Sequence, residues 1–164
     1  MSIQSQKANM KTIYNLVYQD LSYTFGEKES GPNGAKKQFH TKSAAFLRAL
    51  GNDLGLKEFR VSKNYAGIAV SGEITLMGLW DDCIGVYFEI SQSLTGRHDF
   101  LYRSITHMRD STGGQNQWMD IGLFKKQDYE KAISLLMALR KYADADTTGN
   151  AQDISAKAVR HHVA

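Results

Sequence analysis

Residues 111–118, STGGQNQW, combine two adjacent glycines with hydroxyl groups, side-chain amides and a tryptophan. Successive N–H groups of flexible glycines can form an anion-binding concavity, and amide side chains can pair with a peptide backbone or a base edge. The segment lacks the lysine and the glycine spacing of nucleotide-binding loops. A tight turn that packs its tryptophan on the core edge explains the same residues. The binding candidates here are Gly113, Gly114, Gln115, Asn116, Gln117 and Trp118.

Residues 35–48, AKKQFHTKSAAFLR, form a basic stretch around the expected start of a helix, for which Thr41 or Ser43 is the predicted N-cap. Free N–H groups and the helix dipole favour an anion at such a start, so a phosphate or a nucleic-acid backbone is one predicted ligand. The alternative is a solvated helix start in which Phe39 acts as a hydrophobic staple. The candidates for anion or nucleic-acid binding are Lys36, Lys37, His40, Lys42 and Arg48.

A third group lies on the polar face of the predicted strands, where Tyr87, Glu89 and Arg103 are the binding candidates. Arg103 and His107 are four residues apart and would therefore share one face of an extended strand. If they converge with Glu73 and Glu89 they could perform acid–base chemistry, which makes an enzyme one alternative. Cross-strand pairs of glutamate and arginine are also ordinary on the solvated side of a sheet.

The remaining reactive residues carry weaker signals. Residues 80–83, WDDC, are explained by a hairpin turn, because neighbouring carboxylates in a strand point to opposite sides. Cys83 is the only cysteine, so neither an internal disulfide nor a cysteine-rich zinc site can form. His161 and His162 are interpreted as an incidental pair. The sequence contains no catalytic, dinucleotide-binding or metal-binding motif, and we predict no cofactor and no metal site.

Three helices and four strands are predicted to position these groups. Apolar residues recur at spacings of three and four in three segments, which predicts helices over residues 7–23, 41–54 and 128–142. Gly55 is placed to end the second helix, and Pro32 marks a polar loop before it. Residues 143–150, ADADTTGN, are predicted to be a linker.

Between the second and third helices, apolar residues alternate with polar ones, which predicts strands over residues 58–64, 67–80, 85–93 and 99–108. Short polar turns separate these strands, so we predict an antiparallel meander. Ile74 and Leu76 should share a face with Phe88, because a slip of one residue would expose apolar side chains. The fourth strand is ambiguous, since both its odd-numbered and its even-numbered positions carry large apolar residues.

The order of elements predicts an α+β fold, with a four-stranded antiparallel meander sheet and two N-terminal helices and one C-terminal helix packed on one face. Residues 1–143 are predicted to form a single domain, and residues 144–164 a flexible or partly helical tail. The formal net charge is only +3. No apolar run reaches the roughly 18 residues of a membrane span, and the lone cysteine and the lack of a signal-like start favour the cytoplasm.

From these features we predict a small, non-catalytic cytoplasmic protein that binds another protein through the polar sheet face and the flanking loops. Aromatic and amide side chains make contact surfaces at low entropic cost, and glutamates on the face repel phosphate. Nucleic-acid binding through residues 36–48 and an enzyme on the sheet face remain alternatives. Small proteins of this kind include accessory proteins carried by bacterial phages and plasmids, and such a mobile-element origin is part of the prediction. The sequence does not specify an oligomeric state.

Overall fold

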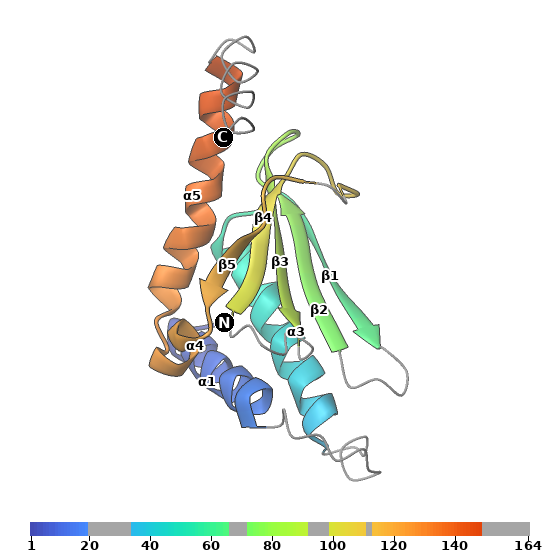
Figure 1. Ribbon diagram of the computed structural model, residues 1–164, viewed down its shortest axis with the longest axis vertical. Helices are drawn as coiled ribbons and strands as arrows, with labels where there is room; N and C mark the ends of the chain where they lie inside the picture. Colours follow the sequence, from blue (N-terminus) through green and yellow to red (C-terminus); the bar gives the residue numbers. More distant parts are fainter. Residues whose placement is uncertain (20–33, 66–71, 92–98, 111–112, 149–164) are drawn as a thin grey trace, which may run out of the picture.

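A computed structural model describes residues 1–19, 34–65, 72–91, 99–110 and 113–148 (Figure 1). Its elements, in chain order, are α1 (Ile3–Gln19), α3 (Ala35–Asp53), β1 (Glu58–Tyr65), β2 (Gly72–Leu79), β3 (Gly85–Ser91), β4 (Asp99–Ile105), β5 (Gln117–Asp120), α4 (Gly122–Lys126) and α5 (Tyr129–Thr148). The strands form one antiparallel sheet in the order β1-β2-β3-β4-β5. The α+β class and the meander are confirmed, and the described sheet has five strands instead of four.

The β2–β3 hairpin has the predicted register. Ile74 lies opposite Ile90 and Leu76 lies opposite Phe88. All four side chains are fully buried on the face that the helices cover. The carboxylate of Asp81 holds the turn before β3. Its Oδ1 accepts hydrogen bonds from the backbone N–H groups of Cys83 and Ile84, each at 3.0 Å. The WDDC segment is therefore a hairpin turn, as predicted.

The structure resolves which face of β4 is buried. Phe100 and Tyr102 point to the helices, and the Phe100 ring centroid lies 4.3 Å from that of Phe124. Leu101 and Arg103 lie on the opposite face, since each residue of a strand alternates sides. The strand ends at Ile105 and not at Met108 as predicted.

Two short elements after β4 were not predicted. β5 pairs with β4, placing Leu101 opposite Trp118 and Phe100 opposite Met119. It has four residues, too few for a period of two to stand out from the polar segment before it. The five-residue α4 follows and buries Leu123 and Phe124.

The helix bounds differ from prediction at several ends. α1 begins at Ile3, four residues before the expected start, and its expected end at Tyr23 lies outside the described residues. α3 begins at Ala35, so neither Thr41 nor Ser43 is its cap. The predicted end of α3 is confirmed, because Gly55 follows with φ +67°. α5 continues to Thr148, so the first residues of the predicted linker are helical.

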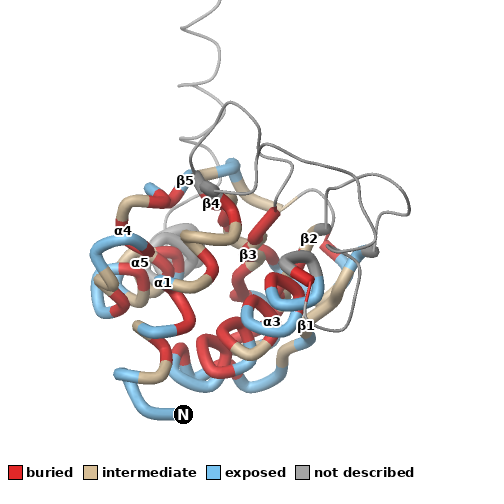
Figure 2. Tube along the Cα trace, turned by 90° about the horizontal axis from the view of Figure 1, so that it is seen from below, coloured by how far each residue is buried: buried red, intermediate tan, exposed pale blue. Residues whose placement is uncertain are grey.

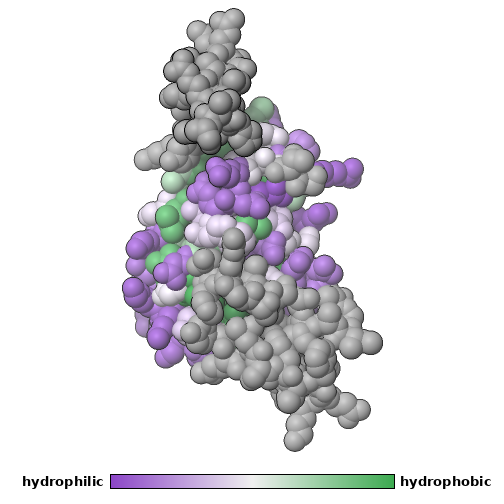
Figure 3. All heavy atoms as spheres, in the orientation of Figure 1, coloured by the Kyte–Doolittle hydropathy of each residue, from purple (hydrophilic) through white to green (hydrophobic). Residues whose placement is uncertain are grey.

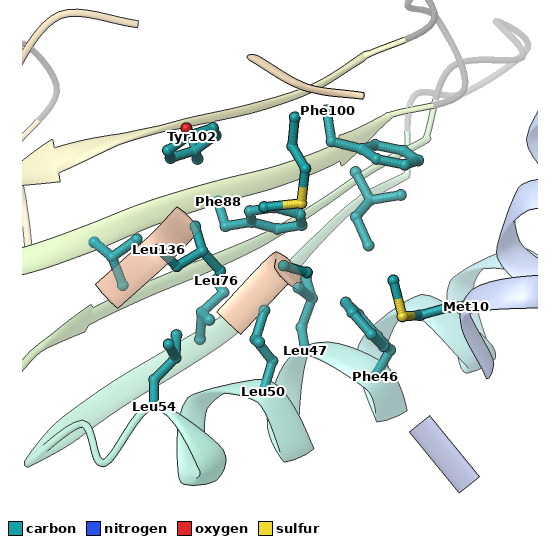
Figure 4. Close-up of a cluster of buried hydrophobic side chains, with 14 of the residues drawn as sticks. Met10, Phe46, Leu47, Leu50, Leu54, Leu76, Phe88, Phe100, Tyr102 and Leu136 are labelled. Atoms are coloured by element: carbon teal, nitrogen blue, oxygen red, sulfur yellow. The ribbon is translucent and has the colours of Figure 1, made fainter. Parts of the chain in front are cut away.

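The helices form a single layer on one side of the sheet (Figure 2). α3 packs on β1 and β2, α5 packs on β3 and β4, and α1 lies against α3, α4 and α5. Apolar side chains of α3 meet those of the strands between the two layers (Figure 4). The indole Nε1–H of Trp80 donates to the carbonyl of Leu54 at 2.8 Å, which joins the end of β2 to the end of α3. The helices thus pack on one face of the sheet, and the candidate site lies on the opposite face.

Candidate functional site on the polar sheet face

The face of the sheet opposite the helices is covered by no described helix. We call it the polar sheet face and define it by Glu73, Thr75, Tyr87, Glu89, Arg103 and Trp118. The register aligns two rows of side chains across the strands: Thr75, Glu89, Leu101 and Trp118 form one row, and Met77, Tyr87 and Arg103 form the next. Figure 3, in the view of Figure 1, shows hydrophilic residues gathered over the upper part of the sheet.

Tyr87, Glu89 and Arg103 interact directly. The Tyr87 hydroxyl donates to Oε2 of Glu89 at 2.8 Å. The guanidinium carbon of Arg103 lies 4.7 Å from the centroid of the Tyr87 ring, within the range of a cation–π contact. Nη2 of Arg103 also donates to the Asp110 carbonyl at 3.5 Å. The structure therefore brings together these three predicted residues, which come from two adjacent strands.

Partial burial shapes the acid–base properties of this cluster. Desolvation raises the pKa of Glu89 above its usual range, and the neighbouring Glu73 adds to the effect, while the Tyr87 hydrogen bond and Arg103 oppose it. Burial, followed by the nearby Glu89 charge, raises the pKa of Tyr87, so its phenol keeps its proton and remains a donor. Glu89 is thus a half-buried carboxylate whose orientation is set by a phenol.

The glycine pair of STGGQNQW belongs to a turn that folds back on β4. Asp110 is buried, and its carboxylate accepts hydrogen bonds from the Thr106 backbone N–H at 2.9 Å and from the Gly113 N–H at 2.6 Å. The Gly114 N–H donates to the Ser104 carbonyl at 2.8 Å. Gly113 has φ +51°, a conformation that glycine adopts without strain. Both N–H groups are therefore used within the chain, which favours the turn interpretation over an anion-binding concavity. Ser111 and Thr112 lie outside the described residues.

Trp118 does not pack on the core edge, contrary to the turn interpretation. Its partner in β4 is Leu101, which places the indole on the polar sheet face, where the residue is 37% exposed. Gln117 pairs with Tyr102 and so points to the other face. Gln115 and Asn116 are exposed in the segment that leads into β5. Of the two predicted residues that lie in β5, Trp118 is therefore the one on the same face as Tyr87, Glu89 and Arg103.

One end of this face is apolar. Leu79 and Ile105 are buried although they lie on the side away from the helices. They approach each other over Gly85, where an added Cβ would lie 2.5 Å from Leu79 Cδ2 and 2.9 Å from Ile105 Cγ1. Gly85 is thus required to let two apolar side chains close this end of the face, and the polar region is confined to the other end.

The residues predicted to bind an anion lie within α3 and not around its start, because the helix begins at Ala35. Three of these residues are exposed, namely Lys37, Lys42 and Arg48. The structure does not describe the side chain of Lys36. His40 is only 2% exposed and cannot contribute to a surface site in this conformation, and Phe39 is a core residue instead of a staple. Arg48 borders a hollow of about 350 Å³, which is also lined by Met1, Ala45, Ala49, Asn52 and Asp53.

The predicted acid–base group is not assembled in the structure. His107 lies beyond the end of β4, so it does not share a strand face with Arg103, and its Nδ1 accepts a hydrogen bond from the Arg109 N–H at 3.2 Å. No carboxylate of the described residues forms an ion pair with His107. Within the described ranges, no three His, Cys, Asp or Glu side chains are grouped as metal ligands would be.

The chain matches no protein-family model, no curated protein and no solved structure. Among the described helices, none has both the length and the apolar composition needed to cross a membrane.

Proposed function

We propose that this protein is a non-catalytic binding protein that contacts a partner protein through the polar sheet face. The observation that carries the proposal is the indole of Trp118, which is 37% exposed on a strand whose backbone is paired to β4. Tryptophan supplies a large contact area, and a paired strand holds it at low entropic cost. Of the described residues, Met1 and Ile3 are the other large hydrophobic residues that are exposed, and both lie at the chain start.

A protein partner fits this face better than nucleic acid does. Glu73 and Glu89 carry carboxylates that repel phosphate, and the one arginine of the cluster, Arg103, already contacts the Tyr87 ring and the Asp110 carbonyl. Nucleic-acid affinity rests mainly on cations that contact phosphates. Aromatic residues such as Trp118 and Tyr87 are enriched in protein interfaces.

The experiment is affinity capture from cells of the source organism with the wild type and a Tyr87→Ala/Trp118→Ala double variant. We expect the double variant to fold and to lose the captured partner. The matched control is Ile3→Ala, which removes an apolar side chain that is 54% exposed on α1. Retention of every partner by the double variant, at levels equal to those of Ile3→Ala, would refute the proposal.

A second candidate, nucleic-acid binding through α3, is favoured by the exposure of Lys37, Lys42 and Arg48 along a helix that has no acidic residue in its first turn. It predicts binding of duplex DNA at about 50 mM salt with an affinity that falls steeply as salt rises. A duplex that does not bind at that salt concentration, or an affinity insensitive to salt, would remove this candidate.

We further propose that the protein acts in the cytoplasm as an accessory protein of a bacterial mobile element. The free and exposed thiol of Cys83 suits a reducing compartment. Cell fractionation tests the location, and the genes that surround the coding sequence test the origin: a metabolic operon instead of phage or plasmid genes would contradict it.

A further inference from the structure

A hollow of about 350 Å³ lies on the side of α3 that is turned away from the sheet. Figure 4 shows Leu47, Leu50 and Leu54 of this helix pointing toward the strands. Arg48 and Asn52 lie on another side of the helix, where both are exposed. Small-molecule sites have volumes of about 300–1,000 Å³, so this hollow fits a small ligand. We call it the α3 hollow and define it by its lining residues, which are Met1, Ala45, Arg48, Ala49, Asn52 and Asp53.

One part of the α3 hollow is an apolar wall. Ala45 and Ala49 are four residues apart and therefore lie on one face of the helix. Met1 adds a large exposed apolar side chain, and the buried Asn9 donates from Nδ2 to its Sδ at 3.5 Å. A methionine side chain adapts its shape to the group that it covers. The wall is therefore suited to the apolar part of a ligand.

Asp53 gives the hollow an anion whose orientation is fixed. Its Oδ2 accepts a hydrogen bond from the Tyr129 hydroxyl at 2.6 Å, and that hydroxyl accepts one from Nε2 of Gln6 at 3.3 Å. Tyr129 and Gln6 are both buried. Burial, followed by the hydrogen bond to Asp53, raises the pKa of Tyr129, so the phenol keeps its proton and remains a donor. An exposed carboxylate is thus held by a buried network.

The surroundings of Asp53 favour a cation. Asp53 is the last residue of α3, and the last turn of this helix has no basic residue. The carbonyl groups at the end of a helix carry partial negative charge, which disfavours an acid there and favours a cation. The two ion pairs of the described chain, Lys7–Glu130 and Lys57–Asp82, do not include Asp53. An ammonium group from a ligand would neutralise both the carboxylate and the helix end.

Arg48 supplies the opposite charge. Among the described residues it forms no hydrogen bond and no ion pair. Asn52 follows four residues later on the same helix face, and its amide both donates to an anion and accepts from a cation. A helix rises 1.5 Å per residue, so Arg48 and Asp53 are about 7.5 Å apart along its axis. The long arginine side chain closes this span, and one small ligand can reach both charges.

We propose that the α3 hollow binds an α-amino acid with an apolar side chain. Arg48 pairs with the carboxylate, Asp53 pairs with the ammonium group, and the Asn52 amide bonds to both. The apolar wall covers the side chain of the ligand, and Tyr129 positions Asp53. A dicarboxylate would be repelled by Asp53 and a diamine by Arg48, so the two charges select a zwitterion. This site goes beyond the proposed function, because it lies on the helix side of the sheet and needs no partner protein.

The test is a titration with L-leucine followed by ¹H–¹⁵N NMR. The backbone N–H signals of Ala49 and Asn52 are the reporters, and that of Tyr87 on the polar sheet face is the reference. The comparison ligands are L-leucinamide without the carboxylate, N-acetyl-L-leucine without the ammonium group, and glycine without the apolar side chain. We expect leucine to shift the reporters saturably and each comparison ligand to bind about tenfold or more weakly, since each loses a charge-assisted pair or the apolar contact.

Variants assign the two charges. Arg48→Gln should weaken leucine binding by about tenfold or more and leave leucinamide binding unchanged, because leucinamide has no carboxylate to lose a partner. Asp53→Asn should weaken leucine binding to a similar extent and leave N-acetyl-leucine binding unchanged. The asparagine oxygen still accepts the Tyr129 hydroxyl, so this variant keeps the buried network. The matched control, Arg60→Gln, makes the arginine change at an exposed position of β1 and should leave leucine binding unchanged.

The role of Tyr129 is read from selectivity. Tyr129→Phe removes the hydrogen bond that orients Asp53, so it should weaken the binding of leucine and leave that of N-acetyl-leucine unchanged. Equal weakening of both ligands would refute this positioning role.

Three results would overturn the inference as a whole. They are the absence of a saturable shift with leucine in the wild type, equal affinity for leucine and any one of the comparison ligands, and equal leucine affinity in Arg48→Gln and Arg60→Gln. None of these results depends on capture of a partner protein, so the inference and the proposed function are tested separately.

Discussion

Replacing either glycine of the turn by alanine should destabilise the fold, but for different reasons that one further substitution can separate. At Gly113 a Cβ would lie 2.7 Å from the Ser104 carbonyl oxygen and 2.8 Å from Arg103 Nη1, and φ is +51°. At Gly114 a Cβ would lie 2.1 Å from the Ser104 hydroxyl oxygen but 3.5 Å from the Ser104 Cβ, an ordinary contact. The first clash is with backbone and the second is with a removable hydroxyl.

The magnitudes follow from this geometry. Gly113→Ala should lower the free energy of unfolding by about 2–4 kcal/mol, from the left-handed conformation and from overpacking against a fixed carbonyl. Gly114→Ala should cost about 1–3 kcal/mol in the wild type. In a Ser104→Ala background the cost of Gly114→Ala should fall below about 0.5 kcal/mol, because the contacting atom is gone, whereas the cost of Gly113→Ala should persist.

Urea unfolding of the wild type, Ser104→Ala, the two single glycine variants and their two combinations with Ser104→Ala measures the cost of each glycine substitution in both backgrounds. The reasoning would be refuted if Ser104→Ala rescued Gly113→Ala as fully as Gly114→Ala, or if Gly113→Ala cost less than about 0.5 kcal/mol. Either result would mean that the glycine pair is not required by the turn, and its role as a ligand site would have to be reconsidered.

Three further predictions concern the supports of the site. Asp110→Ala should cost about 2–4 kcal/mol in urea unfolding, because the partly buried N–H groups of Thr106 and Gly113 lose a charged acceptor; a cost near zero would show that the loop does not depend on this carboxylate. Trp80→Phe should cost about 1–3 kcal/mol through the unpaired Leu54 carbonyl, and an unchanged stability would contradict the hydrogen bond. The pKa of Glu89 is raised on folding above its ordinary 4.5, chiefly by burial, so its stabilising contribution is present below that value and is lost as pH rises through the folded pKa. The stability of Glu89→Gln relative to wild type should therefore increase between about pH 4 and pH 7 in parallel unfolding curves, and a constant difference would contradict the raised pKa.

The α+β class and the antiparallel meander could be predicted from the sequence, because residues that are buried in a helix or a strand recur at a regular spacing. The register of β2 against β3 followed from alternation alone, since a slip by one residue would bury Tyr87 and Glu89 in place of Val86 and Phe88. Alternation could not orient β4, because Leu101 is as apolar as Phe100. Packing decided that strand: the Phe100 ring fits against Phe124 of α4, an element too short to predict.

The candidate site was predictable in part. Tyr87, Glu89 and Arg103 were expected on one polar face, and the register places them there. The position of Trp118 was not predictable, because it depends on the pairing of a four-residue strand after a loop. His40 was misjudged because a basic stretch indicates a surface, whereas α3 begins six residues earlier than predicted and His40 is buried within it.

The most direct measurement of the central claim is photo-crosslinking from position 118 in living cells of the source organism. A photoreactive amino acid replaces Trp118 in one variant and Ile3, the more exposed residue on α1, in the control. The account predicts a discrete covalent adduct with a partner protein from position 118 and none from position 3. Adducts from position 3 alone, or from neither position while the protein still co-purifies with its partner, would contradict the claim that the polar sheet face is the binding surface.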